Sequence, residues 1–147
     1  MNSTVELVFS VFGGAMVLLS LYGAATSRRR PYLAGLCFFS LLPIIGESSA
    51  YNTDKAPIHI LMISLALVQL VLTIPDKKLY GRDNPAAASL AAKIGLGTIV
   101  TSVSGAVFIF CLSKNVPAQF GYYHIAFVII IIYTITKGFS SKTSAWK

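Results

Sequence analysis

Two histidines and two carboxylates are the residues of this chain best suited to chemistry. His59 and His124 stand near the starts of two separate apolar segments, and Glu47 and Asp54 precede His59 by twelve and five residues. An imidazole can ligate haem iron, hydrogen-bond a quinone or a lipid headgroup, or exchange protons near neutral pH. The segments that hold these side chains decide which of these roles is open to them.

Those segments are long and apolar. The chain has 147 residues, of which 55% are hydrophobic and 12% charged, whereas a soluble domain carries about a quarter charged residues. A transmembrane helix needs about 20 apolar residues. Five stretches reach or approach this length, at residues 7–27, 31–46, 56–75, 86–113 and 117–136. The sequence predicts an all-α integral membrane protein in which residues 1–147 form one polytopic domain, a bundle of about five transmembrane helices.

Prolines punctuate these stretches. Four of them fall within the first turns, where a missing N–H costs no hydrogen bond; these are Pro31, Pro57, Pro85 and Pro117. Pro43 instead lies inside the second stretch, where it removes a helical hydrogen bond. We expect the second helix to be short, broken near Pro43 and finished before Glu47.

Basic residues fall mainly on one side of these helices. Ten of the twelve share the side of the first interhelical loop, namely Arg28, Arg29, Arg30, Lys77, Lys78, Arg82, Lys93, Lys137, Lys142 and Lys147. Only Lys55 and Lys114 fall on the other side. The positive-inside rule therefore predicts an outside N-terminus and a cytoplasmic C-terminus. This orientation suits a bacterial inner membrane best, and it would also describe a eukaryotic membrane protein inserted from the cytosol. The net charge of +7 predicts contact with anionic lipid and not with nucleic acid.

This topology brings the two histidines to a similar depth. The third and fifth helices both run from outside to inside, and each carries its histidine near its start. The candidate ligand-binding residues in this outer region are His59, His124, Glu47, Asp54, Tyr122 and Tyr123. We place both acidic residues in one interhelical loop. The group could hold haem b between the two histidines, or a quinone; the same residues could also be interfacial anchors.

The fourth stretch is rich in small residues. Gly97, Thr101 and Gly105 follow one another at steps of four, and Gly95, Ser102 and Ala106 form a neighbouring stripe. Small residues let membrane helices approach closely. We expect a central fourth helix and a peripheral, β-branched fifth helix. The small-residue face could meet a helix of the same chain, which we favour, or of a second chain.

Known catalytic and metal-binding patterns are missing from the sequence. The chain contains no CxxC, no HxxxH, no nucleophile elbow and no Gly-rich phosphate loop. We therefore predict no metal site and no catalytic residue. Ion-coupled carriers place ionisable side chains near the bilayer midplane, and the predicted helices have none there, which disfavours a secondary transporter.

These observations favour a non-catalytic subunit, or an accessory or assembly factor, of a larger membrane complex. Its partners would be the lipid bilayer and other membrane-protein subunits or a second copy of itself. Too little chain lies outside the predicted helices to form an independent soluble site. Two alternatives stay open: a haem- or quinone-associated protein with a site near the outer leaflet, and a small oligomeric channel or transporter.

Overall fold

The computed structural model of the chain describes residues 3–26, 28–74, 85–113 and 116–138, and the elements within these ranges are all helices. They are α1 (Ser3–Ala25), α2 (Arg29–Phe39), α3 (Leu41–Asp54), α4 (Pro57–Thr73), α5 (Pro85–Val107), the π-helical turn η1 (Phe108–Leu112) and α6 (Ala118–Gly138). If α3 is counted with α2, and η1 with α5, five helices result. The predicted all-helical bundle is confirmed.

Four of these helices are long and apolar enough to cross a membrane. The stretches are Thr4–Ala25, Arg30–Asp54, Gly95–Leu112 and Ala118–Thr136, while α4 is apolar but shorter, with 17 residues. Several residues of the sequence prediction lie outside the described ranges: Ser27 and Pro75 at the ends of predicted helices, and Lys77, Lys78, Arg82, Lys114, Lys142 and Lys147 in the charge count.

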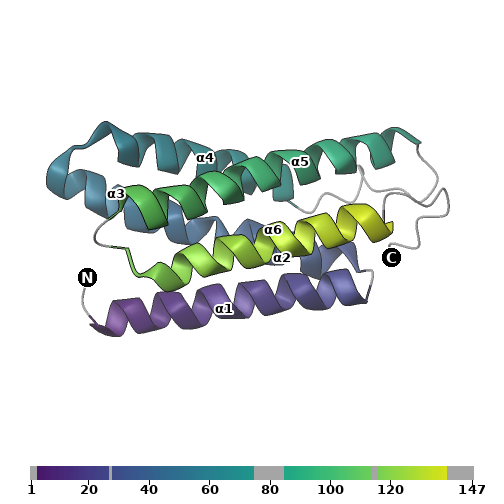
Figure 1. Ribbon diagram of the computed structural model, residues 1–147, viewed down its shortest axis with the longest axis horizontal. Coiled ribbons are helices and arrows are strands. Elements are labelled where there is room, and N and C mark those ends of the chain that lie inside the picture. The colour runs from purple at the N-terminus through teal and green to yellow at the C-terminus, as the bar shows by residue number, and fades with distance from the viewer. Residues whose placement is uncertain (1–2, 27, 75–84, 114–115, 139–147) are drawn as a thin grey trace.

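Successive helices run in opposite directions, with α3 continuing the direction of α2 (Figure 1). The start of α1 and the end of α6 therefore lie at opposite ends of the bundle. The main helix contacts follow a closed order, from α1 to α2, α4, α5, α6 and back to α1, and α3 packs on α4. This ring encloses an interior that several helices share.

The helix starts follow the prolines. Helix α4 begins at Pro57 and α5 at Pro85, and α6 begins directly after Pro117. Proline fits the first turn because its fixed φ suits a helix and its missing N–H has no helical partner there.

The second pass of the chain is broken at Ser40. Pro43 has no N–H to donate to the Phe39 carbonyl, and its ring crowds that carbonyl, so α2 ends at Phe39 and α3 begins at Leu41. The predicted break near Pro43 is confirmed. The predicted end of this helix before Glu47 is wrong, since α3 continues to Asp54. Glu is a good helix former, and the side chain of Glu47 is buried and paired against α4, so its charge does not end the helix.

Glycines set the closest approach of α1 and α2. A Cβ at Gly23 would meet the backbone of Tyr32, and one at Gly35 would meet Ser20 Oγ and a carbonyl of α1. Ser20 is fully buried and donates a hydrogen bond of 2.9 Å to the Tyr32 carbonyl. Only residues without a side chain leave room for backbones this close.

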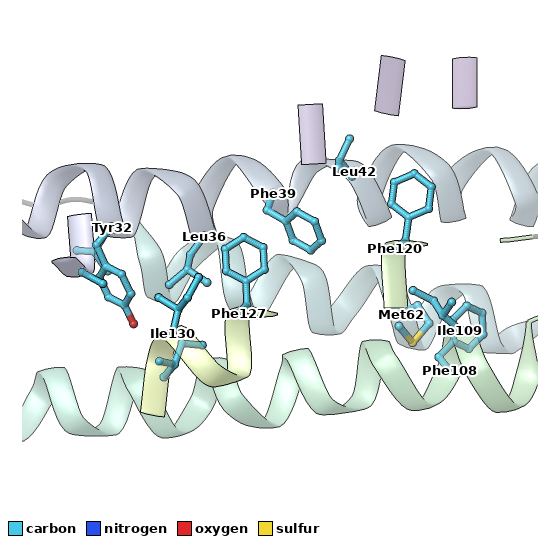
Figure 2. Close-up of a cluster of buried hydrophobic side chains, with 13 residues drawn as sticks. Tyr32, Leu36, Phe39, Leu42, Met62, Phe108, Ile109, Phe120, Phe127 and Ile130 are labelled. Carbon is cyan, nitrogen blue, oxygen red and sulfur yellow. The ribbon is translucent and has the colours of Figure 1, made fainter. Parts of the chain in front are cut away.

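Aromatic and aliphatic side chains fill the interior. The rings of Phe39 and Phe127 lie with centroids 4.6 Å apart, and Leu36 and Ile130 lie beside them in the same cluster (Figure 2). Helix α6 supplies Phe120, Phe127, Ile130 and Ile131 to this core. The buried share of residues is 39% in the spans of both α5 and α6, so the expectation of a peripheral fifth helix is wrong. Its β-branched composition hid a buried stripe at helical spacing.

The α1–α2 contact yields a stability prediction. Gly35→Ala should lower the free energy of unfolding by about 1–3 kcal/mol, because the added methyl group overpacks the crossing of the two helices. Gly46→Ala is the matched control, since a Cβ there meets nothing within 4 Å. It should raise the free energy of unfolding by about 0.5–1 kcal/mol through helix propensity. Unfolding in detergent, followed by circular dichroism, measures both; equal effects would contradict the described contact.

Candidate functional site at the α3–α4 end of the bundle

One imidazole joins two carboxylates where α3 meets α4. Nδ1 of His59 lies 2.5 Å from Oε2 of Glu47, and Nε2 lies 3.0 Å from Oδ2 of Asp54. Since an ionised carboxylate only accepts hydrogen bonds, two such bonds require either an imidazolium or a proton on one carboxyl group. We refer to Glu47, Asp54 and His59 as the carboxylate–histidine triad.

A two-residue turn fixes the triad. Helix α3 ends at Lys55 in the left-handed conformation, with φ 59° and ψ 19°, and the Lys55 N–H donates to the Tyr51 carbonyl at 2.9 Å. The Ala56 N–H donates to Oδ1 of Asp54 at 2.9 Å. One carboxylate oxygen of Asp54 therefore holds the turn, and its other oxygen bonds to His59.

Burial increases steadily along the triad. The side chain of Asp54 is 55% exposed, that of His59 12% and that of Glu47 9%. The triad thus connects the end of the bundle with a carboxylate enclosed by α3 and α4. Because an imidazole can accept a proton on one nitrogen and release one from the other, this order can carry a proton inward.

The predicted loop placement of the acidic residues is wrong. Glu47 and Asp54 both belong to α3, and only Asp54 is exposed. Their spacing of seven residues puts them on one side of a helix, two turns apart. That spacing could have revealed the pairing if the helix had been expected to continue past Glu47.

His124 belongs to a second, deeper cluster. It is only 7% exposed, its ring packs edge-on against Phe39 at 5.1 Å, and a Cβ at Gly105 would lie 2.6 Å from it. Within the described part of the chain, Nδ1 of His124 has no hydrogen-bond partner. The ring lines a small cavity between the helices, together with Phe39, Ser40, Pro43, Met62, Leu65, Ala66, Gln69, Thr101 and Gly105. At about 10 Å³ the cavity has room for about one water molecule.

Gln69 and Thr101 form the polar wall of this cavity. The Thr101 hydroxyl lies 2.8 Å from Oε1 of Gln69, and Nε2 of Gln69 donates a long bond of 3.4 Å to the Leu36 carbonyl. Both residues are buried: Thr101 is 6% exposed and Gln69 is 3% exposed. The pair links α2, α4 and α5 through polar groups within the apolar interior.

The other small residues of α5 face its two neighbours. A Cβ at Gly97 would lie 2.8 Å from Leu72 on α4, and one at Gly95 would lie 2.9 Å from a side chain of α6. Ser102 and Ala106 are buried as well. In the described structure, helices of the same chain cover this face.

The two tyrosines do not join the triad. Tyr122 is 63% exposed and packs against Phe110 with ring centroids 5.3 Å apart. Tyr123 donates a hydrogen bond of 3.0 Å to the Ser10 carbonyl on α1, where Gln119 also bonds to the Ser10 hydroxyl. Gln119 and Tyr123 thus attach α6 to α1, while Tyr122 packs on η1.

The two histidines thus lie in separate clusters. Both nitrogens of His59 are engaged by carboxylates, and the cavity beside His124 has room for about one water molecule. This geometry does not favour a haem or a quinone held between the two rings.

Comparison of the chain with protein-family models, curated proteins and solved structures finds no match. Its function therefore has to be argued from its own residues.

The burial order of the triad predicts unequal effects of its two carboxylates on stability. Glu47→Gln should lower the free energy of unfolding by about 1.5–3 kcal/mol, because it weakens a shielded, charge-assisted bond. Asp54→Asn should cost less than about 1 kcal/mol, because solvent screens the exposed partner. Unfolding of both variants in the same detergent tests this, and a larger loss for Asp54→Asn would refute the order.

Proposed function

We propose that this chain is a non-catalytic subunit, or an accessory or assembly factor, of a larger membrane complex. The helices run N-terminus outside to C-terminus cytoplasmic, in a bacterial inner membrane. This orientation rests on the sequence count of ten basic residues against two. Arg28 and Arg30, which are exposed where α1 meets α2, belong to the basic side.

The outer surface of the bundle supports a location in lipid. Large apolar side chains are exposed on all the described helices, among them Val11 and Leu18 on α1, Val71 on α4 and Ile129 on α6. Each of these four is more than 60% exposed. A soluble monomer rarely leaves such contiguous apolar surface in water.

The observation that best supports a partner subunit is the low burial of α1. Its spanning stretch is 22% buried, against 39% in each of the other three spans. Its outward face presents Val8, Val11, Ala15 and Leu18, at alternating steps of three and four residues. This is the spacing of a helix face that can pack against another helix. We therefore place the partner's transmembrane helix along α1.

Co-purification tests this placement. The tagged full chain would be purified from its native membrane in mild detergent, and proteins present at a fixed ratio would be identified by mass spectrometry. Val11→Trp should reduce recovery of the partner at least about fivefold, because overpacking an interface costs about 1–3 kcal/mol. Val71→Trp is the matched control on α4, since Val11 and Val71 are 65% and 67% exposed; it should leave recovery unchanged.

One result would refute the subunit role, and another would refute only the placement of the interface on α1. If the unaltered chain purifies without any partner at fixed ratio, the subunit role is wrong. If a partner is present but Val71→Trp removes it and Val11→Trp does not, the role stands and the interface lies on α4.

A further inference from the structure

The triad lies one helical turn from the cavity of His124. Pro43 precedes Glu47 by four residues on α3, and Met62 follows His59 by three residues on α4; both line the cavity. Residues three or four apart on a helix lie on the same side. The α3–α4 seam therefore continues from the triad directly into the cavity.

Beyond the cavity, buried polar side chains continue toward the other end of the bundle. Gln69 lies ten residues after His59 on α4, which is about 15 Å along the helix, and Thr73 donates to the Gln69 carbonyl at 2.7 Å. On the facing helices, the Thr134 hydroxyl lies 3.2 Å from the Tyr32 hydroxyl. Each of these side chains is buried; the described buried polar residues are Ser20, Ser40, Glu47, Gln69, Thr73, Thr98, Thr101, Ser102, His124 and Thr134.

Ser and Thr are common between packed membrane helices, where they hydrogen-bond, whereas buried ionisable side chains such as Glu47 and His124 are rare there. Hydrogen bonds between membrane helices contribute only about 0.6 kcal/mol on average, and ionisable groups within spans commonly mark ion or proton pathways. Nδ1 of His124, unpaired within the described residues, lies among this polar series. An imidazole that is more than nine-tenths buried and has one nitrogen unpaired can receive a proton from a water molecule in the cavity.

We propose that the interior of this bundle conducts protons, with the triad as the entrance and His124 as the inner relay. A proton from the water reaches Oδ2 of Asp54 and passes to Nε2 of His59, while the proton on Nδ1 passes to Oε2 of Glu47. The imidazole remains neutral, and exchange of its tautomer resets it. No electrons are transferred.

The next step releases the proton from Glu47 to a water molecule in the cavity and then to Nδ1 of His124. Among the cavity-lining residues, His124 is the one titratable group, and the polar remainder are the neutral side chains of Ser40, Gln69 and Thr101. Burial disfavours an imidazolium there, so His124 passes the proton on and does not retain it. As Nδ1 of His124 receives this proton, Nε2 releases its own proton toward the Ser102 hydroxyl, which precedes Gly105 by one helical turn on α5 and has no partner within the described residues. A water molecule on the far side of Ser102 then accepts the proton and carries it out.

The groups around the triad favour entry of a cation. Its two carboxylates face one imidazole, so at least one negative charge remains even when His59 is protonated. The neighbouring cation, Lys55, lies over the Tyr51 ring at 5.1 Å and donates to Asn52 at 3.4 Å. Its charge is thus directed to groups other than the two carboxylates.

Proton flux into vesicles tests the proposal. The purified full chain would be reconstituted into phosphatidylethanolamine–phosphatidylglycerol vesicles that contain a pH-sensitive dye. A potassium gradient with valinomycin would make the interior negative, and the rate of internal acidification would be recorded. This measurement does not depend on the proposed subunit role, since it uses the chain without partners.

The unaltered chain should acidify the vesicles faster than protein-free vesicles do. Glu47→Gln and His124→Phe should each reduce the protein-dependent rate by roughly a hundredfold, the scale expected when a positioned proton-transfer group is lost. Thr101→Val should reduce the rate as well, while Thr26→Val should not. Thr26 is the matched control because its hydroxyl is exposed and bonds within α1.

Asp54→Asn tests the pathway in a variant that should fold normally. The side chain of Asp54 is more than half exposed, so replacing its carboxylate by an amide should leave the fold intact. It should slow acidification, most strongly at high external pH where protons are scarce. The proposal is overturned if the unaltered chain acidifies vesicles no faster than lipid alone. It is also overturned if Glu47→Gln and His124→Phe, shown to be folded by circular dichroism, retain the full rate.

Discussion

The interior of this bundle depends on a hydrogen bond that Pro43 cannot make. Without an N–H at this position the helix breaks at Ser40, and the second pass of the chain becomes two helices. The break allows α2 to pack on α1 while α3 packs on α4. Phe39, Ser40 and Pro43, the residues at the break, line the cavity beside His124. The same constraint therefore shapes the cavity and brings Glu47 to His59.

Several polar groups of the interior are bonded by neighbours on other helices. Gln69 contacts Thr101 on α5 and a carbonyl of α2, and Thr134 contacts Tyr32. In lipid, a polar group without such a partner costs several kilocalories per mole. The bonded groups thus fix the relative positions of the helices. His124 Nδ1 and Ser102 Oγ, which the described residues leave unpaired, differ from them in being open to a mobile ligand.

Much of the fold could be predicted from local signals in the sequence. Apolar length and proline position indicated the helices, and Pro57 and Pro85 mark two helix starts directly. The candidate site was less accessible. His59 and His124 could be assigned a depth, because depth follows from position along a helix, but lateral neighbours depend on the order of helices around the ring. Glu47 was misplaced because a charge normally ends an apolar span, but Glu is a good helix former and α3 continues past it to Asp54, with Glu47 paired to His59 on α4.

The contact between α1 and α6 has a consequence for how the protein is made. Ser10 on α1 bonds to Gln119 and Tyr123 on α6, so the ring of helices closes only after α6 has been made and, in the proposed membrane location, inserted. Until then the cavity lacks the side that His124 supplies, and its polar wall of Gln69 and Thr101 is left uncovered on that side. If the bundle lies in a membrane as proposed, synthesis passes through a stage in which an unfinished chain displays polar surface within the bilayer. A membrane chaperone or a protease could recognise that surface as a mark of incomplete assembly.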